Sequence, residues 1–377
     1  MSNQACTSVK EKSESAQGPK IDRIDRAMQP FIDHGELSGA VTLVADEKNI
    51  LHLSASGRRD IANQLPMRTD TIFWIASMTK PMTSTAIMML QEEGKLSIDD
   101  RVSKYIPEFA GLKTPSGKAA NLTLRQLLTH TSGLQEAPKD KTHQARTLGE
   151  LIPYYLDRPT LFEPGKDWKY CQSGINTLGR IVEIVSGQTY ADFLQRRIFD
   201  PMGMKEATFY PSREQIGRLA VSYAMTDGKL QPVTIALLPG PVGDRDHYAA
   251  ANGGLFCTAE EYCRFCRMLL NGGTLDGRQY LRPETIHEMT RIQTDGIPEV
   301  GFIPGSAWGL AVGIVRQPVG ITAMLSPGTF GHGGAYGTEA WIDPVKNRIY
   351  ILLIQRADLK NSDDSEFRKA FQLAAAR

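Results

Sequence analysis

The chain has 377 residues, a formal net charge of +1 and an apolar content of 41%, which is ordinary for a globular protein. That length allows two or three domains, or one large α/β body with an insertion. The balanced charge gives no support for a nucleic-acid partner. No apolar run is long enough to cross a bilayer as a helix. We therefore expect no nucleic-acid partner and no membrane span.

The amino-terminal segment, residues 1–21, is polar and lacks the apolar run of a signal peptide. Its composition predicts a disordered lead, because it offers too little apolar surface to bury. The absence of a signal favours a cytoplasmic protein. A periplasmic or secreted location stays open if a signal segment was removed.

The next segments alternate between helical and strand-like patterns. IDRIDRAMQPFIDHGEL (21–37) has amphipathic helical spacing. GAVTLVAD (39–46) and NILHLSASG (49–57) are β-rich runs around a charged turn, which predicts a hairpin. From residue 96 the signals are mainly helical, with long loops, and strand-like runs return in the last quarter of the chain.

This order predicts an α+β fold with an antiparallel sheet flanked by helices. The sheet is assembled from both chain ends, and a helical lobe is inserted between them. We expect a sheet domain over 22–95 and 250–377 and a helical lobe over 96–249. A functional site is expected in the cleft between the two lobes.

The stretch FWIASMTKPMTSTAIMML (73–90) places Ser77 three residues before Lys80, at the start of an apolar helix. Pro81 is tolerated in a first helical turn, so the helix begins near Ser77, and Gly94 ends it. Residues three apart share a helix face. Burial and the helix dipole lower the pKa of a lysine there, which would let it activate a serine nucleophile. Alternatively, Ser77 is a helix cap and Lys80 a surface residue.

Several ordered segments decide between these alternatives: FWIASMTK, LLTHTSGL, WKYCQSGINTLGRIVEIVSG, IFDPMGM, NGGLFCTAEEYCRFCRMLLNGG and FGHGGAYGTEAWIDP. Together they resemble the penicillin-recognising serine hydrolases, a superfamily that holds class C β-lactamases, D-Ala-D-Ala peptidases and family VIII carboxylesterases. The resemblance runs from about residue 22 to 356. Ser-x-x-Lys is the first motif of that superfamily, so the resemblance favours catalysis by Ser77 and Lys80.

The resemblance also assigns the second and third motifs. The second, usually Tyr-x-Asn, falls on Tyr170 and Gln172, so Gln replaces Asn. The third, usually Lys-Thr-Gly on an edge strand, falls on His332, Gly333 and Gly334. The departures at 172 and 332 affect substrate contacts and leave the nucleophile and its activator intact.

Roles follow from the resemblance. Tyr170 or Lys80 takes the proton of Ser77, and we expect nearby cations to lower the pKa of the Tyr170 phenol. The pair titrates as a unit, so the base stays open. The backbone N–H groups of Ser77 and Ala335 form the oxyanion hole. Gln172 donates to a substrate carbonyl, and Gly333 and Gly334 allow close approach of substrate to the strand.

His332 directs the substrate prediction. A lysine in its place attracts a substrate carboxylate, whereas histidine is mostly neutral at pH 7. We therefore expect an ester or amide substrate without an obligatory carboxylate, most simply a small acyl ester. The alternative for His332 is a structural strand histidine.

Other candidate sites are weaker. GDRDHY places Asp244, Asp246 and His247 together, but such a loop is more typical of a solvated turn than of a metal site. Cys263 and Cys266 form a C-x-x-C without a second ligand pair, so we expect two thiols on a buried helix face. His130, Thr131 and Ser132 are expected to be structural. No metal and no cofactor are predicted.

The function predicted from the sequence is a serine hydrolase acting through an acyl-enzyme, most simply a carboxylesterase. A β-lactamase, a D-aminopeptidase or an acyltransferase of the same fold stays open. So does a non-catalytic binding protein. The natural substrate, the acyl-chain length, the enantiopreference and the oligomeric state are not predicted.

Overall fold

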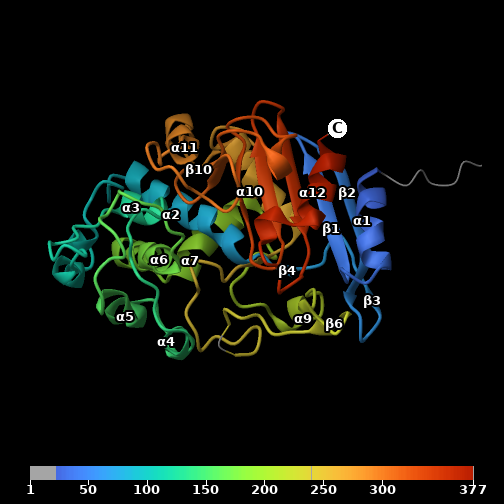
Figure 1. The fold of residues 1–377 in the computed structure, drawn as a ribbon, viewed down its shortest axis with the longest axis horizontal. Helices are drawn as coiled ribbons and strands as arrows, with labels where there is room; N and C mark the ends of the chain where they lie inside the picture. The colour runs from blue at the N-terminus through green and yellow to red at the C-terminus, as the bar shows by residue number, and fades with distance from the viewer. Residues whose placement is uncertain (1–22, 239, 377) are drawn as a thin grey trace, which may run out of the picture.

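The computed structural model describes residues 23–238 and 240–376, so the predicted disordered lead lies outside the described residues. An antiparallel sheet of eight strands forms the centre of the molecule (Figure 1). In sheet order the strands are β10 (Ser306–Trp308), β11 (Gly313–Val315), β12 (Phe330–Gly333), β13 (Glu339–Asp343), β14 (Arg348–Leu353), β1 (Gly39–Ala45), β2 (Ile50–Asp60) and β3 (Leu65–Pro66). Because β14 pairs with β1, the two chain ends meet inside the sheet. This confirms the predicted fold class.

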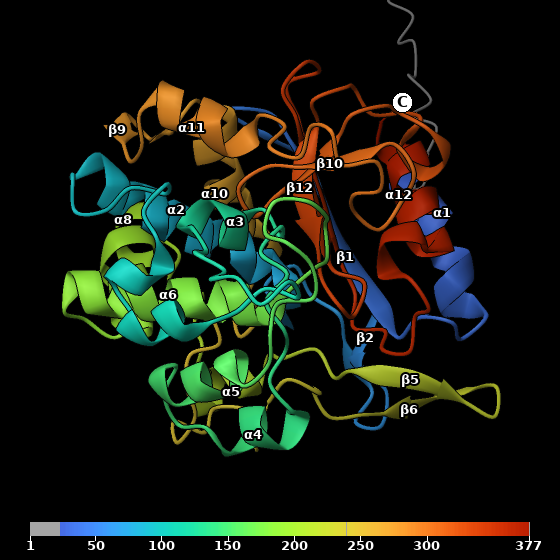
Figure 2. The same cartoon turned by 60° about the vertical axis from the view of Figure 1, so that its left-hand side comes forward.

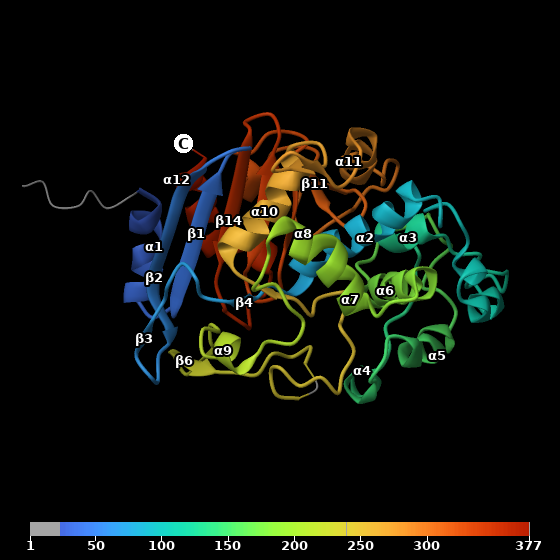
Figure 3. The same ribbon diagram turned by 180° about the vertical axis from the view of Figure 1, so that it is seen from behind.

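Helices cover both faces of the sheet. α1 (Arg23–Asp33) and α12 (Glu366–Ala375) lie on one face, and α10 (Ala259–Leu270) lies on the other (Figures 1 and 3). Side chains of β1 alternate between the two cores: Val41 contributes to the core under α10, and Val44 to the core under α1 and α12. Coverage on both faces explains the continuous apolar run of β1. The predicted hairpin with β2 is also confirmed.

The helical side of the molecule lies beside this sheet (Figure 2). Its helices are α2 (Lys80–Glu92), α3 (Leu124–Leu128), α4 (Lys139–Gln144), α5 (Ile152–Leu156), α6 (Gln172–Ser186), α7 (Tyr190–Leu194) and α8 (Asp200–Met202), and α11 (Pro283–Thr290) follows α10. The short helix α9 (Arg213–Ile216) lies beneath the sheet (Figures 1 and 3). Among the described residues, no helix is both long and apolar enough to span a membrane.

Shorter elements connect these helices and strands. The 3₁₀ turns are η1 (Ala76–Thr79), η2 (Val102–Lys104), η3 (Pro107–Gly111), η4 (Gly149–Leu151), η6 (Gly320–Thr322) and η7 (Ser362–Asp364), and η5 (Gln195–Phe199) is a π-helix. The two-stranded pairs are β4 (Phe73–Trp74) with β7 (Phe256–Cys257), β5 (Tyr223–Thr226) with β6 (Lys229–Pro232), and β8 (Thr274–Leu275) with β9 (Arg278–Gln279). The β5–β6 pair lies within 96–249, so that interval is not wholly helical. The domain boundaries stay a prediction.

The helix that carries the first motif forms as its sequence predicts. η1 leads directly into α2, with Pro81 in the first turn of α2, and Gly94 follows the helix with φ +68°. Side chains from Lys80 to Leu90 are all buried, because α2 packs between α6 and the central sheet. The one difference is that the first turn is a 3₁₀ turn, which places Ser77 ahead of the α-helix proper.

Candidate active site

The turn that carries Ser77 has an unusual backbone. Ala76, directly before it, has φ +47°, a left-handed conformation that is uncommon for a residue with a Cβ. Such a conformation costs roughly 1–3 kcal/mol and persists only where the surroundings enforce it. Here the Thr79 hydroxyl donates to the Ala76 carbonyl over 2.7 Å, and this bond helps to hold the turn. The Ser77 residue is left half-buried, whereas its neighbours Ala76 and Met78 are buried.

Lys80 is completely buried, and its amine contacts three oxygen atoms. Nζ lies 3.0 Å from Ser77 Oγ, 2.8 Å from Gln172 Oε1 and 2.6 Å from the Asn252 carbonyl oxygen. The two carbonyl oxygens can only accept hydrogen bonds. A neutral amine therefore gives its two hydrogens to them and directs its lone pair at the Ser77 hydroxyl. This arrangement suits removal of the serine proton.

Burial lowers the pKa of Lys80 to about 7, and the charge of Glu136 acts weakly in the opposite direction. No ion pair of Lys80 occurs among the described residues, so no carboxylate in direct contact stabilises its charged form. A large fraction of the lysine is consequently neutral at physiological pH. The sequence expectation of a lowered lysine pKa agrees with this geometry.

Tyr170 and His332 form the other half of the cluster. The His332 ring Nδ1 lies 2.6 Å from the Gly333 carbonyl oxygen, which can only accept, so Nδ1 carries the ring hydrogen. The Nε2 lone pair then accepts from the Tyr170 hydroxyl, 3.3 Å away. Burial lowers the pKa of His332 to about 3, and the nearby charge of Lys80 adds to the effect. His332 is therefore neutral, as expected from its residue type.

The expectation that cations lower the pKa of Tyr170 is wrong. Lys80 Nζ does lie 4.6 Å from the centroid of the Tyr170 ring. Burial nevertheless raises the pKa of the phenol well above its usual value, and the nearby Ser77 side chain offsets only part of that rise. The ring packs against His130 and Phe302, with centroids 4.4 Å and 4.9 Å away. Aromatic surroundings disfavour a phenolate, so Tyr170 is present as the neutral phenol.

The strand β12 is only partly an edge strand. β11 pairs with Phe330 and Gly331 alone, so the chain from His332 onward is unpaired on that side. The prediction of an edge strand therefore holds for the third motif. The residues before the motif are paired because β11 begins at Gly313, opposite Gly331, and runs away from the motif.

The third motif runs directly against the nucleophile turn. A Cβ added to Gly334 would lie 2.7 Å from the Ile75 carbonyl oxygen and 3.4 Å from Ala76 Cβ, so only glycine fits there. Ala335 follows and is exposed. In the described part of the chain, no backbone hydrogen bond in a turn or loop uses the Ala335 N–H. Both predicted oxyanion donors, Ser77 N–H and Ala335 N–H, thus belong to segments in contact.

Two further residues organise the site and were not predicted. Glu136 accepts from the backbone N–H groups of Gln172 (2.6 Å) and Ser173 (2.9 Å), at the positive end of α6. Asn252 donates through Nδ2 to Gln172 Oε1 over 3.0 Å and offers its carbonyl to Lys80. Gln172 is thereby fixed with its oxygen toward the lysine. Its Nε2 stays available for the predicted contact with a substrate carbonyl.

No sequence pattern marks Glu136 or Asn252. Glu136 is an exposed loop residue, and Asn252 acts mainly through its backbone carbonyl. The only signal was the position of Asn252 at the start of NGGLFC, one of the segments that carried the family resemblance.

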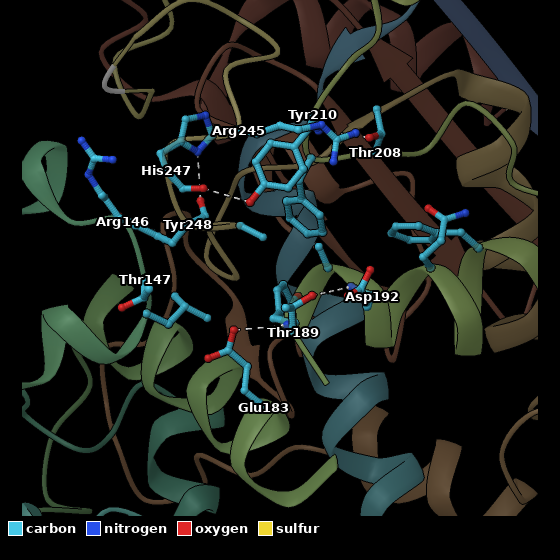
Figure 4. Close-up of a pocket in the computed structure, with 17 residues that line it drawn as sticks. Arg146, Thr147, Glu183, Thr189, Asp192, Thr208, Tyr210, Arg245, His247 and Tyr248 are labelled. Carbon is cyan, nitrogen blue, oxygen red and sulfur yellow. Dashed lines mark hydrogen bonds between the residues drawn. The ribbon is translucent and has the colours of Figure 1, made fainter. Parts of the chain in front are cut away.

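A cavity of about 270 Å³ lies next to this cluster. Gln172 and Asn252 line it, and Tyr155, Leu237 and Tyr248 are among the other side chains of its wall. Tyr248 also lines a second cavity of about 530 Å³, shown in Figure 4, which includes His247, Tyr210 and Arg245. Tyr248 is thus shared by the two spaces.

The loop that suggested a metal site is a turn. Asp244 Oδ1 accepts from the Asp246 N–H over 2.9 Å, and the His247 ring is directed to the second cavity (Figure 4). Throughout 23–238 and 240–376, no group of three or more His, Cys, Asp or Glu side chains is placed to hold a metal ion. Cys263 and Cys266 are free, buried thiols in α10, as predicted.

His130 and Ser132, which were expected to be structural, both make hydrogen bonds that hold the backbone. His130 is buried and accepts the Cys171 N–H at Nδ1 over 3.1 Å, behind the Tyr170 ring. Ser132 is buried and accepts the Leu134 N–H over 3.2 Å.

The fold and this cluster define a class: a serine hydrolase with a Ser-x-x-Lys pair at the start of a buried helix. The family model described as Beta-lactamase matches residues 24–375. Protein Rv1367c of Mycobacterium tuberculosis is 32% identical over 363 residues, covering 89% of this chain and 90% of that protein. Esterase EstB of Burkholderia gladioli is 28% identical over 366 residues, covering 89% and 90%.

A solved structure with the same fold is that of EstCE1, a hydrolase with promiscuous acyltransferase activity. Its TM-score is 0.81 at 24% identity, with 94% of this chain and 98% of that chain covered. The chain belongs to the β-lactamase family, and it is a serine hydrolase of the β-lactamase fold.

Proposed function

We propose that this serine hydrolase is a carboxylesterase that acts on small acyl esters through an acyl-enzyme on Ser77. The observation that carries the proposal is the buried Lys80 amine, 3.0 Å from Ser77 Oγ, with its two hydrogens taken by carbonyl oxygens. That amine is the base. The neutral Tyr170 is a proton donor, since burial keeps the pKa of its phenol high.

In the acylation step, Lys80 removes the Ser77 proton while Oγ forms a bond to the ester carbonyl carbon. The carbonyl oxygen becomes an oxyanion and accepts from the N–H groups of Ser77 and Ala335. When the bond to the leaving oxygen breaks, that oxygen takes a proton from Lys80, directly or through the Tyr170 hydroxyl. Water then repeats the sequence with Lys80 as base, which releases the acid and restores Ser77.

The charge of the site supports ester substrates without a carboxylate. A lysine in place of His332 would offer an ammonium group to a substrate carboxylate, whereas His332 is neutral across the physiological range. The similarity to EstB, which is an esterase, supports the same chemistry.

The cavity of about 270 Å³ is the proposed acyl pocket. It is lined by Gln172 and Asn252, the two residues that hold Lys80, and by Tyr248. Its volume is just below the range usual for drug-sized ligands, which suits a short acyl chain.

Comparative kinetics tests the proposal. We expect kcat/KM for p-nitrophenyl butyrate to exceed that for a chromogenic cephalosporin. Intact-mass spectrometry should show a butyryl adduct that a Ser77→Ala variant cannot form. A cephalosporin that matches or exceeds the ester would favour a β-lactamase. Loss of labelling by a fluorophosphonate probe in folded protein would favour a non-catalytic binding protein.

A further inference from the structure

A small cavity beside the third motif has a lining that the proposed reaction does not explain. It measures about 20 Å³, and Phe302, Trp308, Trp341, Gly333 and Asp363 contribute to its wall. That volume accommodates one water-sized group. An ammonium head has the same size, whereas a carboxylate is larger.

Asp363 brings a carboxylate to the wall of this cavity. A Cβ added to Gly333 would lie 2.5 Å from Asp363 Oδ1, so glycine at 333 lets the carboxylate touch the strand. Arg368 Nη1 lies 3.4 Å from the same oxygen, but Arg368 makes a closer ion pair with Glu339, at 2.8 Å. Across the described residues, no hydrogen bond ends on Asp363 Oδ2. One carboxylate oxygen is therefore free for a ligand.

Phe302, Trp308 and Trp341 form the aromatic part of the wall, and no cationic side chain contributes to it. The other lining residues are Ile303, Ser306, His332 and three glycines. Aromatic ring faces attract cations. Trp341 already does so, since the Arg368 guanidinium lies 4.4 Å from its ring centroid. Trp308 packs edge-on against neutral His332, with centroids 5.6 Å apart. The Trp341 ring is therefore already occupied by Arg368, and the free oxygen of Asp363 together with Trp308 and Phe302 offers the contacts that favour a cation over an anion.

The position of the cavity indicates which part of a substrate reaches it. The proposed acyl pocket is lined by Gln172 and Asn252, beside Lys80. The small cavity borders His332 and Gly333, and Tyr170 contacts both Lys80 and His332 between the two spaces. If the acyl chain fills the first space, the leaving alcohol extends toward the second.

We propose that the cavity formed by Asp363, Trp308, Trp341 and Phe302 binds a primary ammonium group on the leaving alcohol of the substrate. The preferred substrates are then esters of amino alcohols. This inference rests on the proposed esterase function. A lysine in place of His332 would favour an anionic substrate, whereas the proposed cavity favours a cationic one.

Three rigid acetate esters test the charge preference: 4-(aminomethyl)phenyl acetate, protonated at pH 7, neutral 4-(hydroxymethyl)phenyl acetate and anionic 4-acetoxybenzoate. We expect kcat/KM to fall in that order. In Asp363→Asn the cation-to-neutral ratio should drop roughly tenfold, as expected for loss of a partly buried charge partner with aromatic neighbours. The matched control is Asp364→Asn, which removes the adjacent, exposed carboxylate and should leave the ratio unchanged.

A binding experiment keeps the inference independent of turnover. Benzylammonium should quench tryptophan fluorescence saturably in the wild type and bind roughly tenfold more weakly to Asp363→Asn. Equal binding to both proteins, or equal ester ratios in both, would overturn the cation site. Turnover of the neutral ester without any charge preference would leave the esterase standing and refute this inference. Absence of turnover together with selective benzylammonium binding would refute only the esterase.

Discussion

Lys80 and His332 are both buried nitrogen bases in contact with Tyr170, one in the helix of the first motif and one in the strand of the third. Burial lowers the pKa of Lys80 from 10.5 to about 7 and that of His332 from 6.5 to about 3. The same physical cause leaves the lysine able to gain and lose a proton at neutral pH and leaves the histidine permanently neutral. The intrinsic basicity of each side chain is therefore the reason that we propose Lys80, and not His332, as the base.

The hydrogen-bond partners strengthen this contrast. Two carbonyl oxygens occupy the hydrogens of Lys80 and leave its lone pair for Ser77. His332 instead gives its single hydrogen to a carbonyl and accepts from Tyr170. In the proposed mechanism the lysine therefore performs the proton transfer, while the neutral histidine accepts from the phenol and adds no positive charge to the site.

Removing the nucleophile has the largest expected effect. Ser77→Ala leaves Lys80 with no proton to take, and kcat should fall at least about 10⁴-fold, as for nucleophile deletions in other serine hydrolases. The kcat of the variant is measured by the release of p-nitrophenol from p-nitrophenyl butyrate. Turnover that persists after purification to a single species would place the reaction elsewhere on the protein.

Tyr170→Phe should have the next largest effect. It removes the proton donor to the leaving oxygen and the hydrogen bond to His332, so kcat/KM should drop by roughly 10²–10⁴, the range typical of a general acid–base group. Acylation measured by stopped-flow with p-nitrophenyl butyrate gives this number. Activity close to the wild type would remove the phenol from the mechanism.

His332→Lys introduces the lysine that is usual in the first position of the Lys-Thr-Gly motif. The new ammonium attracts anions, so the ratio of cephalosporin to ester kcat/KM should rise roughly tenfold. His332→Asn, which removes the ring without adding a charge, is the control and should not raise the ratio. An equal rise in both variants would mean that steric access, not charge, limits the cephalosporin.

Tyr248→Ala should have the smallest effect. Because this side chain lines both the acyl pocket and the cavity of Figure 4, its removal should admit longer acyl chains. We expect the ratio of octanoate to butyrate hydrolysis to rise roughly three- to fivefold, a modest change for an apolar pocket. Tyr154→Ala, a nearby substitution on α5 outside both cavities, is the control. An unchanged ratio would mean that the acyl chain lies elsewhere.

The sequence predicted the parts of the site that depend on local pattern. Helix spacing and Pro81 predicted that Ser77 and Lys80 share one face at a helix start, and the family resemblance decided that they are catalytic. The same resemblance assigned Tyr170 and His332, which the fold brings together. Asn252 was missed because it accepts from Lys80 through its backbone carbonyl, a group that every residue has and that no sequence pattern marks. The direction of the Tyr170 pKa was predicted incorrectly, since desolvation by packed rings depends on tertiary contacts.

For the fold, too, the features set by local sequence pattern were predicted and those set by tertiary contacts were not. The antiparallel sheet made from both chain ends was predictable from the order of strand-like runs and from continuous burial in β1. The partial edge of β12 was not, because it depends on where β11 begins, opposite Gly331. Asp363 lies 30 residues after Gly333, and only the tertiary structure brings its carboxylate to that glycine.

The measurement that tests the central claim most directly is the pH dependence of kcat/KM for p-nitrophenyl butyrate. Protonated Lys80 cannot accept the Ser77 proton, so activity should rise tenfold per pH unit below about pH 7 and level off above it. Tyr170→Phe should keep this inflection at reduced activity. An inflection near pH 10, or its disappearance in Tyr170→Phe, would contradict the assignment of a buried, neutral Lys80 as the base.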